Sequence, residues 1–139
     1  MERTLVIIKP EAVKKKLVGK IISIYEDNQL DIIHAHRCLA SKEVLYKHYE
    51  AHQGRDFFDG LVDFMSSSHC IVLVLEGENV VSIVREINGS TNPAKSKPGT
   101  IRYMFGETVQ RNAVHGSESI EAAINEIEIW KDLIRFEAE

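Results

Sequence analysis

The stretch HCIVLVL, residues 69–75, is the strongest strand signal in the chain. Apolar and β-branched side chains follow one another there over a short length, which is typical of a strand buried in a sheet. Residues 4–8, TLVII, have the same character close to the N-terminus. Strands of this kind need other elements packed on them, so the chain is predicted to fold around a covered sheet.

Weaker patterns predict the remaining elements. Residues 30–39 and 113–115 are predicted to form two further strands. Apolar residues at helical spacing predict helices over residues 13–25, 41–52, 57–65, 80–87 and 119–130, with Ser41 and Ser119 at two of the N-termini. Residues 88–100, NGSTNPAKSKPGT, form one long irregular segment, and a loop of this length in a compact domain is often functional.

The resulting order is β-α-β-α-α-β-α-loop-β-α, which favours an α/β (α+β) fold. The strands are too few for a doubly wound sheet. A split β-α-β sandwich fits better, with a four-stranded antiparallel sheet covered by helices. The 139 residues are expected to form one domain, residues 1–139.

Charge and composition exclude some classes of protein. The net charge of -4 and the pI near 5.9 argue against a nucleic-acid-binding surface, but a local basic cluster can still hold an anionic ligand. No apolar run is long enough for a membrane span, and residues 1–11 lack the pattern of a signal peptide, so we expect a cytoplasmic protein. Cys38 and Cys70 are expected to be reduced thiols, with a disulfide or redox role as the alternative.

No glycine-rich phosphate loop is present, because SKPGT lacks the P-loop order and no GxGxxG follows a strand. The histidines offer other chemistry. His34 and His36 share one face of a predicted strand, and His48 and His52 share one face of a predicted helix. Either pair could supply half of a metal site, but no third ligand is evident, and satisfied or solvated histidines are the simpler interpretation.

The stretch NAVHGSES, residues 112–119, places His115 differently. It stands at a predicted strand end beside a glycine, and the serines after it precede a helix N-terminus, which attracts anions. Glu126 lies on that helix and could reach one ring nitrogen, which would leave the other as a fixed nucleophile. A purely structural histidine remains the alternative.

Basic and polar residues at element ends suit a polyphosphate. Lys9 ends the first strand, Arg85 closes a helix, Thr91 lies in the long loop, and Arg102 follows that loop. Each alone is typical of a solvated surface. Phe57 and Leu61 are one helical turn apart and could form either an apolar platform for a flat base or ordinary core.

Four stretches together resemble the nucleoside diphosphate kinases over essentially the whole chain. NAVHGSES is similar to the family's active-site signature, and IIKPEAV, HYEAHQGRDFF and GSTNPAKSKPGTIR resemble its first strand, its tyrosine and phenylalanine segment, and its threonine-containing loop. The resemblance implies a ferredoxin-like fold and transfer of the γ-phosphate of ATP, or another nucleoside triphosphate, to nucleoside diphosphates. This transfer would follow a ping-pong route through a phosphohistidine.

The resemblance also implies roles for individual residues. His115 would carry the phosphoryl group on Nδ1, with Glu126 holding the other ring nitrogen and Ser117 lying between them and the phosphate. Mg²⁺ would be carried by the nucleotide phosphates, without a protein metal site. The residues implied to contact the nucleotide are Lys9 and Tyr49 at the transferring phosphoryl group, Arg85, Thr91 and Arg102 at the other phosphates, Asn112 and Lys9 at the ribose, and Phe57, Leu61 and Val109 at the base.

A few positions depart from the family's usual pattern. Asp56 stands where proline is usual, Glu118 replaces the commoner aspartate, and Ser68 and His69 replace a common Gly-Pro. None of them removes an implied catalytic group.

The family resemblance further implies a homo-oligomer, a tetramer or alternatively a hexamer. The alternatives to this enzyme are a non-catalytic nucleotide-binding relative, a ferredoxin-like nucleic-acid-binding module and a histidine-metal protein.

Overall fold

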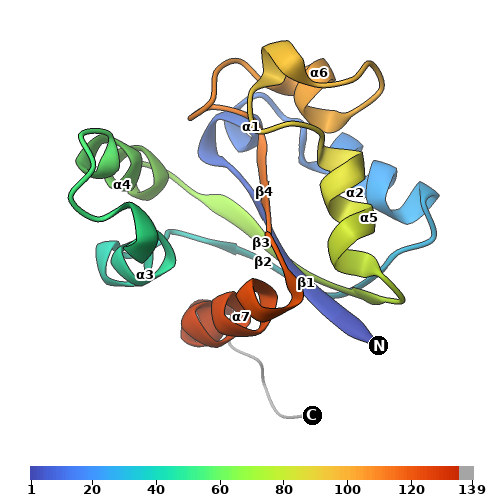
Figure 1. Cartoon of the computed structure of the whole chain (residues 1–139), viewed down its shortest axis with the longest axis horizontal. Helices are drawn as coiled ribbons and strands as arrows, with labels where there is room; N and C mark the ends of the chain where they lie inside the picture. The colour runs from blue at the N-terminus through green and yellow to red at the C-terminus, as the bar shows by residue number, and fades with distance from the viewer. Residues whose placement is uncertain (135–139) are drawn as a thin grey trace.

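A computed structural model describes residues 1–134 of the chain. Its sheet has four strands in the order β2-β3-β1-β4, and every neighbouring pair is antiparallel (Figure 1). This arrangement confirms the predicted split β-α-β sandwich. The last five residues of the expected domain, 135–139, lie outside the described residues. The strands are β1 (Glu2–Ile8), β2 (Asp31–Cys38), β3 (Cys70–Gly77) and β4 (Val114–Gly116).

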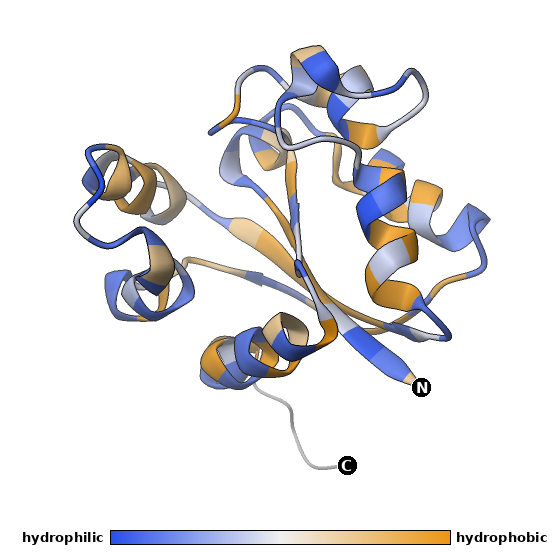
Figure 2. Ribbon diagram, viewed as in Figure 1, coloured by the Kyte–Doolittle hydropathy of each residue, from blue (hydrophilic) through white to orange (hydrophobic). Residues whose placement is uncertain are grey.

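Helices cover both faces of the sheet, and two apolar layers result. Side chains alternate between the faces along each strand, so Val6 and Ile8 of β1 enter one layer while Leu5 and Ile7 enter the other. In Figure 2, β3 is largely hydrophobic, whereas the helices carry both hydrophobic and hydrophilic residues. The helices are α1 (Pro10–Lys14), α2 (Val18–Asp27), α3 (Lys42–His48), α4 (Phe58–Ser66), α5 (Val80–Asn88), α6 (Ile101–Phe105) and α7 (Ile120–Ile134), with 3-10 turns η1 (Glu50–His52) and η2 (Pro93–Lys95).

The predicted helix over residues 13–25 is wrong, because the chain forms two helices there. Lys16 adopts a left-handed φ of 63°, which ends the helical ladder after α1. The Leu17 N–H then bonds the Ala12 carbonyl at 3.1 Å, and the Lys16 N–H bonds Val13 at 3.0 Å. This is a Schellman-type helix end, usually signalled by glycine. Because this position is occupied by Lys16 and not by glycine, the sequence does not indicate that the helix ends here.

Two other boundaries differ from the prediction. Helix α3 ends at His48, so His48 and His52 do not lie on one helix, because residues 50–52 tighten into η1. The long loop leads into α6, which the sequence analysis missed. The side chain of Thr100 accepts a hydrogen bond from the backbone N–H of Tyr103 and caps this short helix. Local capping therefore forms α6 in a segment without clear apolar periodicity.

Two expected helix starts are confirmed by their caps. The Ser41 hydroxyl accepts from the Val44 N–H at 3.2 Å, and the Ser119 hydroxyl accepts from the Ala122 N–H at 3.0 Å. The second cap fixes where α7 begins, directly after the NAVHGSES stretch. Within residues 1–134 no helix combines the length and the apolar character needed to cross a membrane.

Candidate active site

A cleft of about 710 Å³ opens where the ends of β1 and β4 meet the long loop and the α3–α4 pair. All the residues singled out as a site from the sequence line this cleft, except Ser117 and Glu126. The sheet register explains the meeting point, because Ile7 of β1 is paired with His115 of β4. Residues far apart in the chain are therefore brought together by one antiparallel pairing. The predicted residues that line the cleft are Lys9, Tyr49, Phe57, Leu61, Arg85, Thr91, Arg102, Val109, Asn112 and His115.

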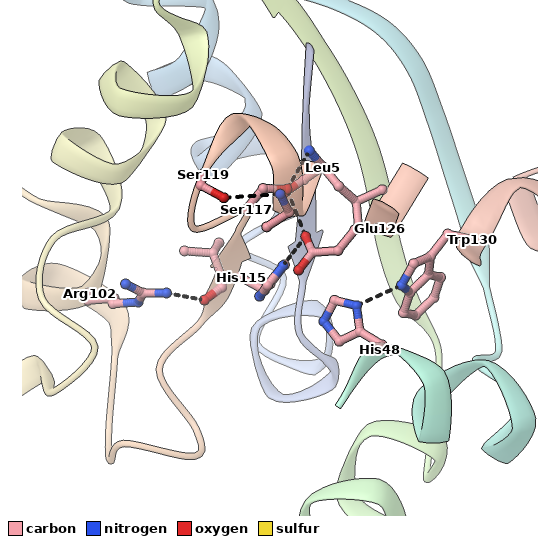
Figure 3. A network of polar contacts seen from close by, with 10 residues as sticks. Leu5, His48, Arg102, His115, Ser117, Ser119, Glu126 and Trp130 are labelled. Atoms are coloured by element: carbon pink, nitrogen blue, oxygen red, sulfur yellow. Dashed lines mark hydrogen bonds and ion pairs between the residues drawn. The ribbon is translucent and has the colours of Figure 1, made fainter. Parts of the chain in front are cut away.

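The ring of His115 is hydrogen-bonded to a carboxylate. Its Nε2 lies 2.9 Å from Oε1 of Glu126, which α7 presents to the ring (Figure 3). Only 20% of the His115 side chain and 12% of the Glu126 side chain are exposed, so water screens this pair weakly. An ionised carboxylate only accepts hydrogen bonds, so Nε2 carries the proton. The other ring nitrogen, Nδ1, is then the one with a free electron pair.

Ser117 fixes the carboxylate rather than facing the cleft. Its hydroxyl donates to Oε1 of Glu126 at 2.7 Å and accepts from the Leu5 N–H at 3.1 Å. Its side chain is fully buried and does not line the cleft, and its place relative to a bound phosphate stays a prediction. Burial acts to raise the pKa of Glu126, but the hydrogen bond from His115, electrostatic interactions with His115 and His48, and the hydrogen bond from Ser117 hold it below its usual value.

His48 packs against the ring of His115, a contact that the sequence analysis missed. The indole Nε1 of Trp130 donates to Nδ1 of His48 at 3.0 Å, and the rings of His48 and His115 meet edge to face with centroids 4.6 Å apart. Burial above all, and then the neighbouring His115, lowers the pKa of His48 to about 3, so it is neutral. His48, His115 and Glu126 offer ligand atoms within 4.8 Å of one another, which is the one grouping among the described residues that could hold a metal ion.

Two cations, the buried Lys9 and the half-buried Arg102, line the cleft together with His115. Lys9 follows β1, and its Nζ donates to the carbonyl of Gln110 at 3.3 Å. Burial is the main reason that the pKa of Lys9 falls to about 8, and the charge of Arg102 adds to this fall. The guanidinium of Arg102 donates to the carbonyls of Gly89 and Val114, both at 2.8 Å, and its Nε is buried without a partner in the described residues. Arg102 therefore joins the loop to β4 as well as facing the cleft.

Buried polar residues that the sequence analysis did not single out support the segments around the cleft. The carboxylate of Glu11 accepts from the Ala113 N–H at 2.8 Å, which supports a left-handed φ of 75° directly before β4. Burial raises the pKa of Glu11. Tyr25 donates to Oδ1 of Asn88 at 2.6 Å, and Asn88 lines the cleft. Both interactions join residues more than sixty positions apart, so no local pattern could have revealed them.

The cleft has a polar side and an apolar mouth. Asn112 is buried and donates to the Thr91 carbonyl at 2.9 Å, while its Oδ1 has no partner among the described residues. Phe57 is 43% exposed and Val109 is 55% exposed, so both offer apolar surface to solvent. Leu61 is 7% exposed and belongs to the core as well as to the cleft wall. The arrangement suits a flat apolar group at the mouth and an anion inside.

The chain is similar to proteins of known activity. The sequence model of the family "Nucleoside diphosphate kinase" matches residues 2–133. A nucleoside diphosphate kinase of Campylobacter concisus is 52% identical over 130 residues, which cover 94% of this chain and 95% of that protein. One from Methanocaldococcus jannaschii is 45% identical over 129 residues, covering 93% and 92%. Among solved structures, the enzyme of Encephalitozoon cuniculi superposes with a TM-score of 0.91 at 37% identity, covering 94% of this chain and 88% of its own, and that of Aquifex aeolicus with 0.88 at 39%, covering 92% and 93%.

Proposed function

The chain belongs to the nucleoside diphosphate kinase family, and we propose that His115 carries the phosphoryl group that this reaction moves between nucleotides. The enzyme takes the γ-phosphate of ATP or another nucleoside triphosphate and passes it to a nucleoside diphosphate. The observation that supports His115 as the carrier is its place in the cleft, with Nε2 held by Glu126 and Nδ1 left as the nucleophile.

The first half-reaction is an attack by Nδ1 of His115 on the γ-phosphorus. An N–P bond forms, the bond to the bridging oxygen breaks, and the nucleoside diphosphate leaves. The ring gains positive charge while Nε2 keeps its proton, and the carboxylate of Glu126 offsets this charge at 2.9 Å. In the second half-reaction, the terminal oxygen of another nucleoside diphosphate attacks the same phosphorus, and the histidine is released. Glu126 and Ser117 are positioning residues in this scheme, because they act through the ring.

The cations of the cleft bind the phosphates. Lys9 and Tyr49 meet the transferring phosphoryl group, and burial raises the pKa of Tyr49, which keeps its hydroxyl protonated as a donor. Arg85, Thr91 and Arg102 hold the remaining phosphates. Phosphoryl transfer depends mainly on alignment and charge stabilisation, which these groups supply.

The apolar mouth accepts the base. Phe57 stacks on it, with Leu61 and Val109 completing the slot, while Asn112 and Lys9 bind the ribose. Stacking tolerates any base because every base has a π-face. An enzyme that serves all nucleosides needs this tolerance.

Members of the family are nucleotide-binding kinases that use a divalent metal, and we propose Mg²⁺ as the ion here. Among the described residues that line the cleft, Glu118 is the only carboxylate, whereas Lys9, Arg85 and Arg102 supply positive charge there. This donor set fits an ion that would be carried by the nucleotide and would neutralise part of the phosphate charge, without a set of protein carboxylates to hold it. We further propose a single domain over residues 1–139, a homo-oligomer (tetramer or hexamer) and a cytoplasmic location, without nucleic-acid or membrane partners.

The test is transfer of label from [γ-³²P]ATP with Mg²⁺ in the absence of an acceptor. Wild type and His36→Gln, a matched variant at a half-buried histidine of β2 that does not line the cleft, should retain acid-labile label that added GDP removes, and His115→Gln should retain none. Label on His115→Gln, or acid-stable label on wild type, would show that another group carries the phosphate.

A further inference from the structure

The chain's two cysteines lie opposite each other on adjacent strands. Cys38 is the last residue of β2, Cys70 is the first residue of β3, and the antiparallel register pairs them directly. We propose that Cys38 and Cys70 form a reversible intramolecular disulfide when a peroxide oxidises the protein. Both are free thiols in the reduced chain described here.

The register places the two residues at the right separation. Directly opposed residues of an antiparallel pair have Cα atoms roughly 4.5 to 5.5 Å apart. A disulfide spans Cα separations of about 4.4 to 6.8 Å, so the strands need not move. Both side chains also point to the same face of the sheet, since Cys70 belongs to the apolar layer under α3, α4 and α7, and Cys38 packs against that layer. The Cys70 thiol already reaches its neighbour, donating to the Cys38 carbonyl at 3.7 Å.

The two thiols differ in reactivity. Cys38 is half-buried at the strand end, so a small oxidant can reach it. A hydrogen bond from the Cys70 thiol lowers the pKa of Cys38, against the opposing effect of burial. Cys70 is fully buried, and its hydrogen bond to Cys38, together with burial, raises its pKa. The thiolate is the reactive form, so Cys38 attacks the oxidant and Cys70 resolves the product.

The chemistry balances with one equivalent of hydrogen peroxide. The Cys38 thiolate attacks one peroxide oxygen, the O–O bond breaks, and the sulfur becomes a sulfenic acid while hydroxide takes up a proton to give water. The Cys70 sulfur then attacks the Cys38 sulfur, its proton joins the leaving hydroxide, and a second water is released. Two thiols lose two electrons, peroxide gains them, and a dithiol reductant reverses the change.

The bond would join the two ends of the segment that carries one wall of the cleft. Residues 39–69 lie between the cysteines and contain α3, η1 and α4. Tyr49, Phe57 and Leu61 belong to this segment. Closing such a loop restricts the unfolded chain, so oxidation should raise the Tm by on the order of 10 °C. The disulfide itself does not depend on the proposed function.

The experiment treats reduced protein with equimolar hydrogen peroxide, quenches with catalase, and counts thiols after denaturation. We expect the two thiols per chain to fall to none, a monomer lighter by two hydrogens, and one peptide pair linking Cys38 to Cys70 in a non-reducing digest. Dithiothreitol should restore both thiols and the original Tm. In Cys70→Ala, dimedone should trap a sulfenic acid on Cys38, whereas Cys38→Ser should leave Cys70 unmodified.

Three results would overturn the proposal. The first is retention of both thiols by the wild type, and the second is a link between chains in place of the internal one. The third is a Tm of the oxidised protein at or below that of the reduced protein, because the bond would then not fit the native sheet. Phosphohistidine formation is measured in a separate experiment. A negative result for the disulfide therefore does not affect the proposal that His115 carries the phosphoryl group, and a negative result for His115 does not affect the proposed disulfide.

Discussion

Replacing Glu126 by glutamine tests how the cleft activates its histidine. Glutamine keeps the shape and an acceptor oxygen but removes the negative charge that lies 2.9 Å from Nε2 of His115. A hydrogen bond to a charged group contributes about 1.5–3 kcal/mol, roughly twice a neutral one, so the loss at the transition state is about 1–2 kcal/mol. The exposed fraction of 12% for the Glu126 side chain leaves little solvent screening to reduce this value. Phosphorylation of His115 should therefore slow by about 5- to 30-fold.

The assay is single-turnover phosphorylation by quenched flow, at saturating ATP and Mg²⁺. Glu121→Gln is the matched control, because Glu121 lies in the first turn of the same helix and is exposed. Its variant should phosphorylate at the wild-type rate. A Glu126→Gln rate equal to the wild-type rate would refute the electrostatic role of the carboxylate. A rate that falls as much in Glu121→Gln would mean that both changes act through the stability of α7.

The pKa shifts and one close contact give three further expectations. Because Lys9 has a pKa of about 8 and is neutral above it, kcat/KM should fall as pH rises through about 8, and Lys9→Gln should give a low but flat alkaline profile in steady-state kinetics. The pKa of His48 is about 3 in the folded chain and about 6.5 in the unfolded chain. Between pH values of about 6.5 and 3, the unfolded chain therefore binds a proton at His48 that the folded chain does not bind. The free energy of unfolding in urea should therefore decrease as the pH is lowered from about 6.5 to 3, and this decrease should be smaller in His48→Gln. A Cβ on Gly116 would lie 2.7 Å from Nδ2 of Asn88, so Gly116→Ala should destabilise by about 1–3 kcal/mol in calorimetry, whereas Gly19→Ala, with nothing within 4 Å, should not.

The charge distribution of the cleft explains how an acidic protein holds a polyanion. The whole chain has a net charge of -4, yet Lys9, Arg85 and Arg102 face one cleft. Lys9 and Arg102 are largely buried, and burial lowers the pKa of each. A bound polyphosphate would supply the missing negative charge. Part of its binding free energy therefore comes from relieving two cations that repel each other in the free enzyme.

Local sequence was enough to determine most of the elements. The apolar runs at residues 4–8 and 69–75 became β1 and β3, because an uninterrupted apolar run is stable only where both faces are covered. Ser41 and Ser119 marked helix starts through caps that close within three residues. The stretch NAVHGSES located His115 at a strand end before a helix. Each of these features depends on neighbours in the sequence, so reading the sequence could find them.

Only the tertiary structure decided how the site is assembled. The Leu5 N–H bonds the hydroxyl of Ser117 across 112 positions, and the same hydroxyl donates to Oε1 of Glu126, two partners that the sequence did not indicate. His48 was interpreted as a satisfied or solvated histidine or half of a metal site, but it packs between Trp130 and His115 and is neutral there. Such contacts form when β1 pairs with β4 and α7 folds back over the sheet. These contacts cannot be predicted from the residue types alone. Their contribution to stability depends on partners that only the complete fold brings within hydrogen-bonding distance.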